Sequence, residues 1–453
     1  MTNQELSHEV LITGEKEIEH VSLFSQLTII AMVLFLLVGT GLPLLFFDTM
    51  TPSDAPNEIT RTIIATDNLS ANDSSHAVDL TGNGLLDYVV GNESGELYWY
   101  EQTAIGTFIS HTINTSHVSG AKVEGVIFID MDNDHNYELI VMDQENDEIR
   151  IYIPDTLGHY SGTWSSVTIL SSRKQVQRPI AFDVDGDETN ELVYAFEGNG
   201  TSTGGLHWLD YDSGPLNASS SFTDYVMVAE PGAWWIGSER RDISGNGKAT
   251  DIVFSSRSGS FNTTPGIFVA LEPGTVTDTW KTVKIEIENK DWLHVYFGNF
   301  FGTSEQDIIA HAFDGTIALY DHDKNWARTS IGADVTEAGY NVFPHYLYRN
   351  DRQKFITTGR ATGILGKVRM VEWYWSGSVW TKRVKTGGIN QKMDIFLRWD
   401  NMNGGGQLEL VGSDSYADNF AYYTFPYDGE AYILNERPFI ETDISSSPKS
   451  SNK

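Results

Sequence analysis

Three segments carry oxygen-bearing side chains at positions 1, 3, 5 and 9 of a loop between two apolar runs: "AVDLTGNGLLDYVV" (77–90), "IFIDMDNDHNYELIV" (127–141) and "AFDVDGDETNELVY" (181–194). Calcium takes about six to eight oxygen ligands, which four side chains, a carbonyl at position 7 and water can supply. The sequence therefore predicts structural calcium (Ca2+) sites. The candidate ligands are Asp79, Thr81, Asn83 and Asp87; Asp130, Asp132, Asp134 and Glu138; and Asp183, Asp185, Asp187 and Glu191.

An EF-hand is excluded by the flanks and the length of these loops. An EF-hand needs helices on both sides and a Glu at position 12, whereas position 12 here is Val90, Val141 or Tyr194 and the flanks are strand-like. The purely structural alternative is a tight turn, because Asp and Asn bond their own backbone readily. In either case the loops would stabilise turns rather than perform chemistry.

A fourth segment, "RRDISGNGKATDIVF" (240–254), is a weaker metal candidate. It keeps three polar side chains in the right places, but its closing carboxylate lies at position 10, one residue too far. The residues concerned are Asp242, Ser244, Asn246 and Asp251. Three further copies, at 296–310, 347–359 and 398–412, lack the acidic set.

The seven copies form an internal repeat. Their leading positions are 79, 130, 183, 242, 299, 349 and 400, so the spacings are 51, 53, 59, 57, 50 and 51 residues. Four short strands can be drawn in each repeat, for example "SHAVDL", "DYVVGN", "GELYWYEQ" and "GTFISHTIN" in the first. Four strands per repeat of about 50 residues are typical of a propeller with four-stranded blades. We therefore predict an all-β fold, a seven-bladed β-propeller over residues 59–436.

The chain ends can close this ring. The segment "EITRTIIA" (58–65) resembles a fourth strand with no first three strands before it. It can complete the last blade beside "MDIFLRW", "QLELVG" and "FAYYTF", which would remove both open sheet edges. The competing fourth strand for that blade is "EAYILNE" (430–436).

The repeats resemble FG-GAP or VCBS-type repeats, the family related to the integrin α-subunit propeller. The segment "DLTGNGLLDYVVGNESGELYWYEQ" is close to that pattern, and "YFGNFFG" (296–302) is similar to its FG element. The resemblance covers about residues 59–436 and is most specific in the first three repeats. It implies a propeller whose acidic loops hold calcium, best supported in those three.

Composition limits the partners. The chain has 453 residues, no cysteine and a net charge of −32, so it has no disulfide or thiolate chemistry. Nucleic acid is disfavoured as a partner, because binding its backbone needs a basic surface. The acidic balance suits a calcium-rich exterior or simple solubility.

Residues 23–47 predict a single transmembrane helix. They carry no charge, and as a helix they would extend about 37 Å, more than the roughly 30 Å hydrocarbon core. The run is too long for a secretory signal and follows an acidic tail at 1–22, although a cleaved signal remains the alternative. Residues 48–58 form a linker, and residues 437–453 form a low-complexity tail expected to be disordered.

Glycosylation sequons favour a propeller outside a single-pass cell-membrane anchor. Seven lie beyond the apolar run and none lies before it. Each alone carries little weight, because such triplets arise by chance in polar loops. The seven are Asn68, Asn72, Asn92, Asn114, Asn199, Asn217 and Asn262.

Two function classes follow. The first is a surface module for recognition, adhesion or scaffolding, with a protein or glycan ligand; its variable loops at 196–205 and 255–266 are the candidate partner surface. The second is a carbohydrate-active enzyme, a lyase or hydrolase, at the mouth of the channel. Its candidate residues are His76, His294, His345, Glu239, Arg240 and Arg241, and the candidate sugar-contact aromatics are Trp234, Trp235, Trp292 and Trp375. No phosphate loop, zinc motif or nucleophile elbow is present, which favours binding over catalysis.

Overall fold

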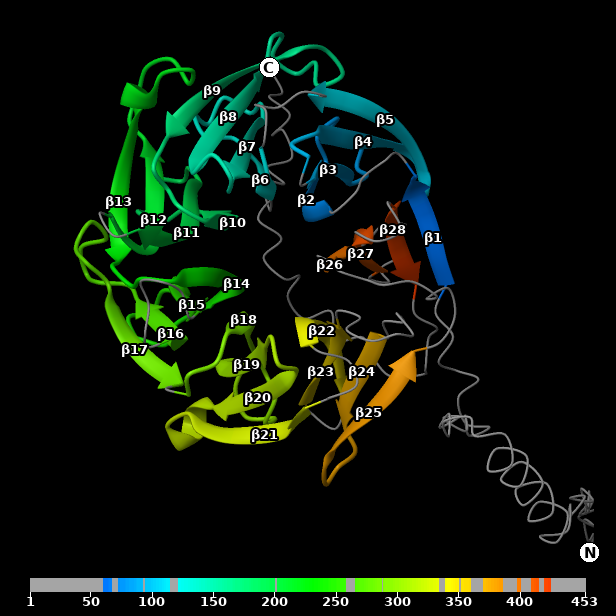
Figure 1. Ribbon diagram of the computed structural model, residues 1–453, viewed down its shortest axis with the longest axis vertical. Helices are drawn as coiled ribbons and strands as arrows, with labels where there is room; N and C mark the ends of the chain where they lie inside the picture. Colours follow the sequence, from blue (N-terminus) through cyan, green and yellow to red (C-terminus); the bar gives the residue numbers. More distant parts are fainter. Residues whose placement is uncertain are drawn as a thin grey trace, which may run out of the picture. The chain divides into compact units, whose positions relative to one another are not determined.

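The computed structural model describes residues 60–66, 72–92, 94–114, 121–199, 202–257, 265–286, 288–333, 339–349, 352–359, 370–385, 397–400, 409–414 and 419–424. The chain divides into two compact units, residues 1–54 and residues 55–453, and all the described residues belong to the second. In that unit the strands form seven four-stranded antiparallel sheets, the blades of a propeller (Figure 1).

Blades 1 to 3 each use four consecutive strands. Blade 1 consists of β2 (Asn72–Val78), β3 (Asp87–Asn92), β4 (Leu97–Ala104) and β5 (Thr107–Asn114). Blade 2 consists of β6 (Val123–Ile129), β7 (Glu138–Asp143), β8 (Glu148–Pro154) and β9 (Trp164–Leu170). Blade 3 consists of β10 (Val176–Phe182), β11 (Glu191–Asn199), β12 (Ser202–Tyr211) and β13 (Phe222–Val228), with a short 3-10 turn at Ser219–Ser221.

Blades 4 to 6 follow the same order. Blade 4 consists of β14 (Ala233–Arg241), β15 (Asp251–Ser256), β16 (Gly266–Leu271) and β17 (Lys281–Glu286). Blade 5 consists of β18 (Trp292–Gly298), β19 (Asp307–Ala312), β20 (Thr316–Asp321) and β21 (Ala327–Ala333), with a 3-10 turn at His322–Lys324. Blade 6 consists of β22 (Gly339–Arg349), β23 (Arg352–Gly359), β24 (Met370–Trp375) and β25 (Trp380–Lys385).

Blade 7 is built from both ends of the domain. Its strands β26 (Leu397–Asp400), β27 (Glu409–Asp414) and β28 (Asn419–Thr424) are completed by β1 (Thr60–Ala65). Strand β1 runs antiparallel to β28, with Thr60 opposite Thr424 and Ile63 opposite Ala421. The prediction that the segment 58–65 closes the last blade is confirmed, and the competing segment 430–436 lies outside the described residues.

Burial explains the strand pattern. The second strand of a blade is buried on both faces, as in β3, β7 and β19, whereas an outer strand such as β17 is exposed or half-buried at every residue but its last. The core lies between neighbouring blades, where Ile127 and Ile140 of blade 2 pack with Leu192 and Tyr194 of blade 3. A two-faced sheet of this kind requires the long apolar runs that the sequence shows.

Tryptophans that recur in the sequence contact residues between neighbouring blades. Trp99 of blade 1 is buried, and its indole N–H donates to the carbonyl oxygen of Tyr160 at 3.0 Å. Trp164 of blade 2 donates to the same carbonyl at 3.0 Å. The Tyr160 hydroxyl in turn accepts the backbone N–H of Tyr137, in the second acidic loop, at 2.9 Å. One residue therefore connects that loop with the packing between two blades.

The segment 196–205 is expected from the sequence to be a loop, but it extends the β11–β12 hairpin, with Gly198 opposite Thr203 and Asn199 opposite Ser202.

Within the described residues no helix has the length and hydropathy of a membrane span. The expected anchor at 23–47 and most of both tails lie outside those residues.

Ring closure by β1 gives a first testable prediction. Replacing Thr62 and Ile63 together by proline should lower the free energy of unfolding by about 3 kcal/mol or more, because one of two adjacent strand residues donates to β28 and proline removes that donor. Urea denaturation followed by tryptophan fluorescence measures the loss. The control is the double alanine variant, which keeps both backbone donors. Equal stability of the two variants would contradict closure through β1.

Candidate metal centres

The four acidic loops share a tight turn closed by the residue at position 1. The carboxylate of Asp130 accepts the backbone N–H groups of Asp134 at 3.0 Å and His135 at 2.9 Å. Asp79, Asp183 and Asp242 accept the equivalent pair of N–H groups in their own loops. One loop can therefore form an Asx-type turn and also hold a metal ion. Whether it is suited to a metal depends on the hydrogen bonds of its closing carboxylate.

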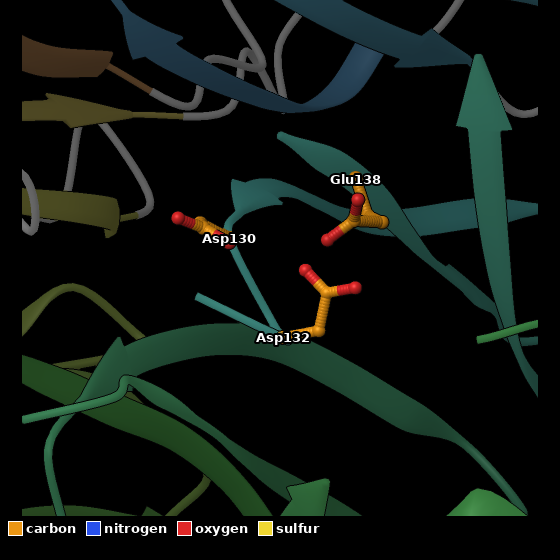
Figure 2. A group of neighbouring side chains, drawn as sticks. All are labelled: Asp130, Asp132 and Glu138. Atoms are coloured by element: carbon orange, nitrogen blue, oxygen red, sulfur yellow. The ribbon is translucent and has the colours of Figure 1, made fainter. Parts of the chain in front are cut away.

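The second loop gathers three carboxylates. One ligand oxygen from each of Asp130, Asp132 and Glu138 lies within 4.8 Å of the others, as Figure 2 shows. Glu138 is fully buried; its Oε2 accepts the N–H of Met131 at 3.1 Å, whereas its Oε1 has no hydrogen-bond partner among the residues that the structure describes. Burial, together with the neighbouring Asp132 and Asp130, raises the pKa of Glu138 to about 9. An oxygen-seeking cation would relieve this buried, unsatisfied group.

The third loop repeats the cluster with Asp183, Asp185 and Glu191, again within 4.8 Å. Glu191 is buried and accepts the N–H of Val184 at 2.5 Å. Burial raises its pKa to about 9, with Asp185 as a further cause. Asp210, at the end of β12, adds negative charge near this loop, and burial together with Asp185 raises its pKa to about 6.

The side chains at position 5 have a different role in the second and third loops. Asp134 accepts the N–H of Asn136 at 2.8 Å, and Asp187 accepts that of Thr189 at 2.8 Å. Neither belongs to the two carboxylate clusters. The two clusters therefore bring together positions 1, 3 and 9 of the predicted ligand sets, while position 5 shapes the turn.

The first loop is satisfied by its own backbone. Asp87 accepts N–H groups from Leu80 at 3.0 Å, Thr81 at 3.1 Å and Gln102 at 2.8 Å. Asn83 donates its side-chain Nδ2 to the carbonyl oxygen of Gln102 at 2.9 Å. All four of these partners are backbone groups, so Asp87 and Asn83 already have hydrogen-bond partners within the folded chain.

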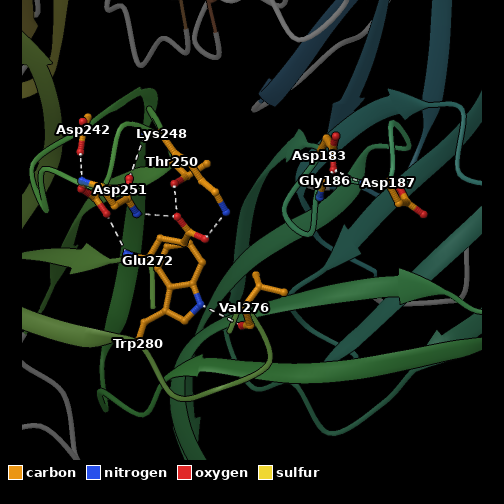
Figure 3. Close-up of polar contacts among 11 residues, drawn as sticks. Asp183, Gly186, Asp187, Asp242, Lys248, Thr250, Asp251, Glu272, Val276 and Trp280 are labelled. Carbon is orange, nitrogen blue, oxygen red and sulfur yellow. Dashed lines mark hydrogen bonds and ion pairs between the residues drawn. The ribbon is translucent and has the colours of Figure 1, made fainter. Parts of the chain in front are cut away.

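The fourth loop also caps itself and supplies its own cation, as Figure 3 shows. Asp251 accepts N–H groups from Ile243 at 2.6 Å, Ser244 at 2.6 Å and Glu272 at 2.7 Å. The buried Glu272 carboxylate then accepts Lys248 Nζ at 2.9 Å, and also accepts from Asn246 at 2.7 Å and Thr250 at 3.0 Å. The Lys248 ammonium therefore offsets the charge of Glu272, while Ser244 takes part through its backbone N–H.

Sequence reasoning missed a third capped loop, in blade 5. Asp307 accepts N–H groups from Phe300 at 3.0 Å, Phe301 at 3.0 Å and His322 at 3.1 Å. The available signal was the Asp at position 9 counted from Asn299. It was overlooked because positions 1, 3 and 5 of this copy, "NFFGTSEQD", are not acidic.

Lys248 provides a second prediction. Lys248→Met should lower the free energy of unfolding by about 1–2 kcal/mol, because Glu272 would lose a charged donor while keeping its two neutral ones. The stability change should be equal in chelator and in millimolar calcium, measured by differential scanning fluorimetry. Lys290→Met, which removes the exposed ion pair to Asp314 in blade 5, is the matched control. A loss seen in chelator that calcium reverses would show that the fourth loop can bind an ion.

The residues proposed for a channel enzyme are engaged in packing. His76 accepts the N–H of Phe128 from the next blade at 3.2 Å, and His294 stacks on Trp235 with ring centroids 3.7 Å apart. Arg241 donates to Glu305 at 3.0 Å. His345 lies in β22. Within the described residues, the acidic groupings able to hold a metal are those of the second and third loops.

Two of the four candidate sugar-contact aromatics are contradicted by burial, because Trp235 and Trp292 belong to the core between blades. The other two are partly exposed, and each is covered by a guanidinium group. Arg257 lies over Trp234 at 4.2 Å, and Arg352 lies over Trp375 at 3.8 Å.

The sequons fall in different environments. Asn217 is exposed, whereas Asn92 is buried, with its amide N donating to Glu96 at 2.8 Å, an arrangement that leaves no room for a glycan. Asn72, Asn114 and Asn199 lie at strand ends. Asn68 and Asn262 lie outside the described residues.

One of the comparisons with known proteins identifies a repeat. Residues 79–141 match the family model of the FG-GAP-like repeat. No curated protein matches the chain. Three solved structures are similar. The Dos1 propeller is 11% identical, with 79% of this chain and 78% of that chain covered and a TM-score of 0.47. YCF48 bound to D1 peptide is 14% identical, with 83% of this chain and 99% of that chain covered and a TM-score of 0.48. Raptor of Chaetomium thermophilum is 11% identical, with 91% of this chain and 36% of that chain covered and a TM-score of 0.49. At these scores the likenesses carry no argument about function. The sheet order and the matched repeat together make this chain a seven-bladed β-propeller with an FG-GAP-like repeat at residues 79–141.

Proposed function

We propose that this protein is a membrane-anchored, extracytoplasmic recognition or scaffolding protein whose propeller is stabilised by calcium in blades 2 and 3. The observation that carries the calcium proposal is the buried Glu138, with one unpartnered carboxylate oxygen beside Asp130 and Asp132. All three ligands are hard oxygen donors, which suit calcium better than softer metals. Millimolar calcium outside cells would keep such sites filled.

The anchor proposal rests on the uncharged run at 23–47. A helix of that length spans a bilayer, and residues 48–58 would separate the propeller from it. The exposed sequon at Asn217 supports an exterior location, since glycans attach at accessible Asn residues. Alkaline carbonate extraction and protease treatment of intact cells test both points. Release by carbonate, or protection of the propeller from protease, would refute the anchor or the orientation.

The proposed partner face lies opposite the calcium loops. The acidic loops join first and second strands, whereas the β11–β12 hairpin and the β15–β16 connection join second and third strands. Because neighbouring strands are antiparallel, these connections emerge at opposite ends of the strands. Calcium can therefore stabilise the blades without covering the surface that meets a partner.

Native extraction tests the recognition role. The full-length chain is purified from its own membranes in calcium, and chemically crosslinked partners are compared with those of a variant whose β11–β12 hairpin is shortened by removing residues 198–203, which leaves Glu197 and Gly204 as a two-residue turn. We expect an unchanged melting temperature and loss of the crosslinked partner. Ile105→Ser, in the β4–β5 turn on the opposite face, is the control. Retention of the partner refutes the face, and turnover of a polysaccharide that is lost in Arg241→Ala would favour the enzyme instead.

Calcium binding should depend on pH with a defined sign. Because Glu138 and Glu191 have pKa values raised to about 9 in the folded chain, they hold protons at neutral pH that an ion must displace. We expect about one proton released per ion and a Kd that rises about tenfold per pH unit of acidification below pH 9. Without calcium, the same raised pKa values favour folding below about pH 4.5, an advantage lost as pH rises towards 9. Calorimetry in buffers of different ionisation enthalpy counts the protons; zero release would contradict these protonation states.

A further inference from the structure

One position of the third strand is equivalent in five blades. Tyr88 pairs with Tyr100 in blade 1, and Leu139 pairs with Tyr152 in blade 2. Tyr100 and Tyr152 therefore occupy the same place in their strands, and so do the residues two positions after them, Gln102 and Pro154. The same count, made from the corresponding pairs of second and third strands in blades 3, 4 and 5, gives the other three equivalent residues. They are Tyr211, Glu272 and His322.

In blades 1, 4 and 5 the backbone N–H at this position caps the closing aspartate. Gln102 donates to Asp87, Glu272 donates to Asp251 and His322 donates to Asp307, at 2.8, 2.7 and 3.1 Å. Together with the two N–H groups of the loop itself, each aspartate accepts three hydrogen bonds. A carboxylate has about four acceptor sites, so little capacity remains for an ion.

Blades 2 and 3 lack this third donor. Pro154 has no backbone N–H, and the Oε1 atom of Glu138 has no hydrogen-bond partner within the described part of the chain. In blade 3 the Glu191 carboxylate accepts the N–H of Val184, and among the described residues it receives no hydrogen bond from the Tyr211 N–H. Within the same part of the chain, Glu138 accepts one hydrogen bond where the capped aspartates accept three.

We infer that the third-strand N–H decides which loops take a cation, and that Pro154 is the positioning residue that keeps Glu138 available in blade 2. This inference rests on the proposed calcium sites and goes beyond them, because it limits occupancy to two ions. The capped loops of blades 1, 4 and 5 are stable without metal. Blade 4 adds its own positive charge through Lys248, 2.9 Å from Glu272.

The test restores the missing donor. The full-length chain carries Asp183→Asn and Asp185→Asn, which silence the third loop, so that calorimetry with calcium reports the second loop alone. Adding Pro154→Ala supplies an N–H beside Glu138. We expect calcium to bind about tenfold more weakly and the melting temperature in chelator to stay equal or rise. Those two opposite effects separate a new hydrogen bond from general damage, which would lower the melting temperature in both conditions.

Pro179→Ala is the matched control, because it also adds an N–H to a strand, β10, outside the acidic loops; it should leave the affinity unchanged. An unchanged affinity in Pro154→Ala would overturn the role of Pro154. Three or more ions on the wild-type chain would overturn the limit to blades 2 and 3 while leaving the calcium proposal standing. No calcium uptake by the wild type would overturn both.

Discussion

Removing calcium from the full-length chain is expected to lower the free energy of unfolding by about 5 kcal/mol. Each ion bound only by the folded state contributes about 2.7 kcal/mol at a free concentration a hundredfold above Kd. The contributions of the two sites should add, because the cluster that contains Asp132 and the cluster that contains Asp185 share no ligand. Denaturant unfolding in millimolar calcium and in chelator measures the difference.

Single variants divide this effect between the two loops. Asp132→Asn and Asp185→Asn should each remove about half of the calcium-dependent stability, and the double variant should remove nearly all of it. Thr81→Ala, in the backbone-capped first loop, is the control and should leave the calcium dependence intact. Equal stability of the wild type with and without calcium would refute the calcium sites.

Replacing a capped aspartate should have a comparably large effect that calcium does not alter. Asp307→Ala would leave three buried or partly buried N–H groups, those of Phe300, Phe301 and His322, without their acceptor. Each lost partner costs about 1–3 kcal/mol, partly recovered by water, so we expect a total loss of about 3–5 kcal/mol. The loss should be equal in chelator and in calcium.

Asp307→Asn is the informative companion, because it keeps the shape and one acceptor oxygen. It should lose less stability than Asp307→Ala. Hydrogen exchange of the three amides by NMR or mass spectrometry would locate the effect in blade 5. Normal protection of these amides in the alanine variant would refute the capping role.

The fold could be predicted from the sequence because its determinants are local and repeated. Each blade needs a buried second strand and a turn-forming loop, and both are visible as apolar runs around Asp79, Asp130 or Asp183. Closure was also visible, since the strand at 60–65 had no partner of its own. By contrast, the segment 196–205 was taken as a loop because it differs most between repeats, although pairing of Gly198 with Thr203 makes it part of the β11–β12 hairpin.

The division between capped and open loops could not be seen in the motif. The loops of blades 1, 2, 3 and 5 share the same spacing, and Asp and Glu at position 9 look interchangeable in a pattern. The difference depends on a donor from the third strand, about 15 residues away, and on the register that aligns Pro154 with Gln102. The burial of Trp292 likewise depends on a neighbouring blade.

The closing strand β1 must also wait for its partner while the chain is being synthesised. Strand β1 leaves the ribosome before every other strand of the propeller, yet its partner β28, with Thr424 opposite Thr60, leaves last. At about 5–20 residues per second, translation leaves β1 without its partner for tens of seconds. Throughout that interval the propeller of the nascent chain is not closed, and strand β1 lacks its partner β28. A chaperone that holds extended segments would therefore matter most for the first strand made, and a stalled or truncated chain would present the same unpaired edge to aggregation and to proteases.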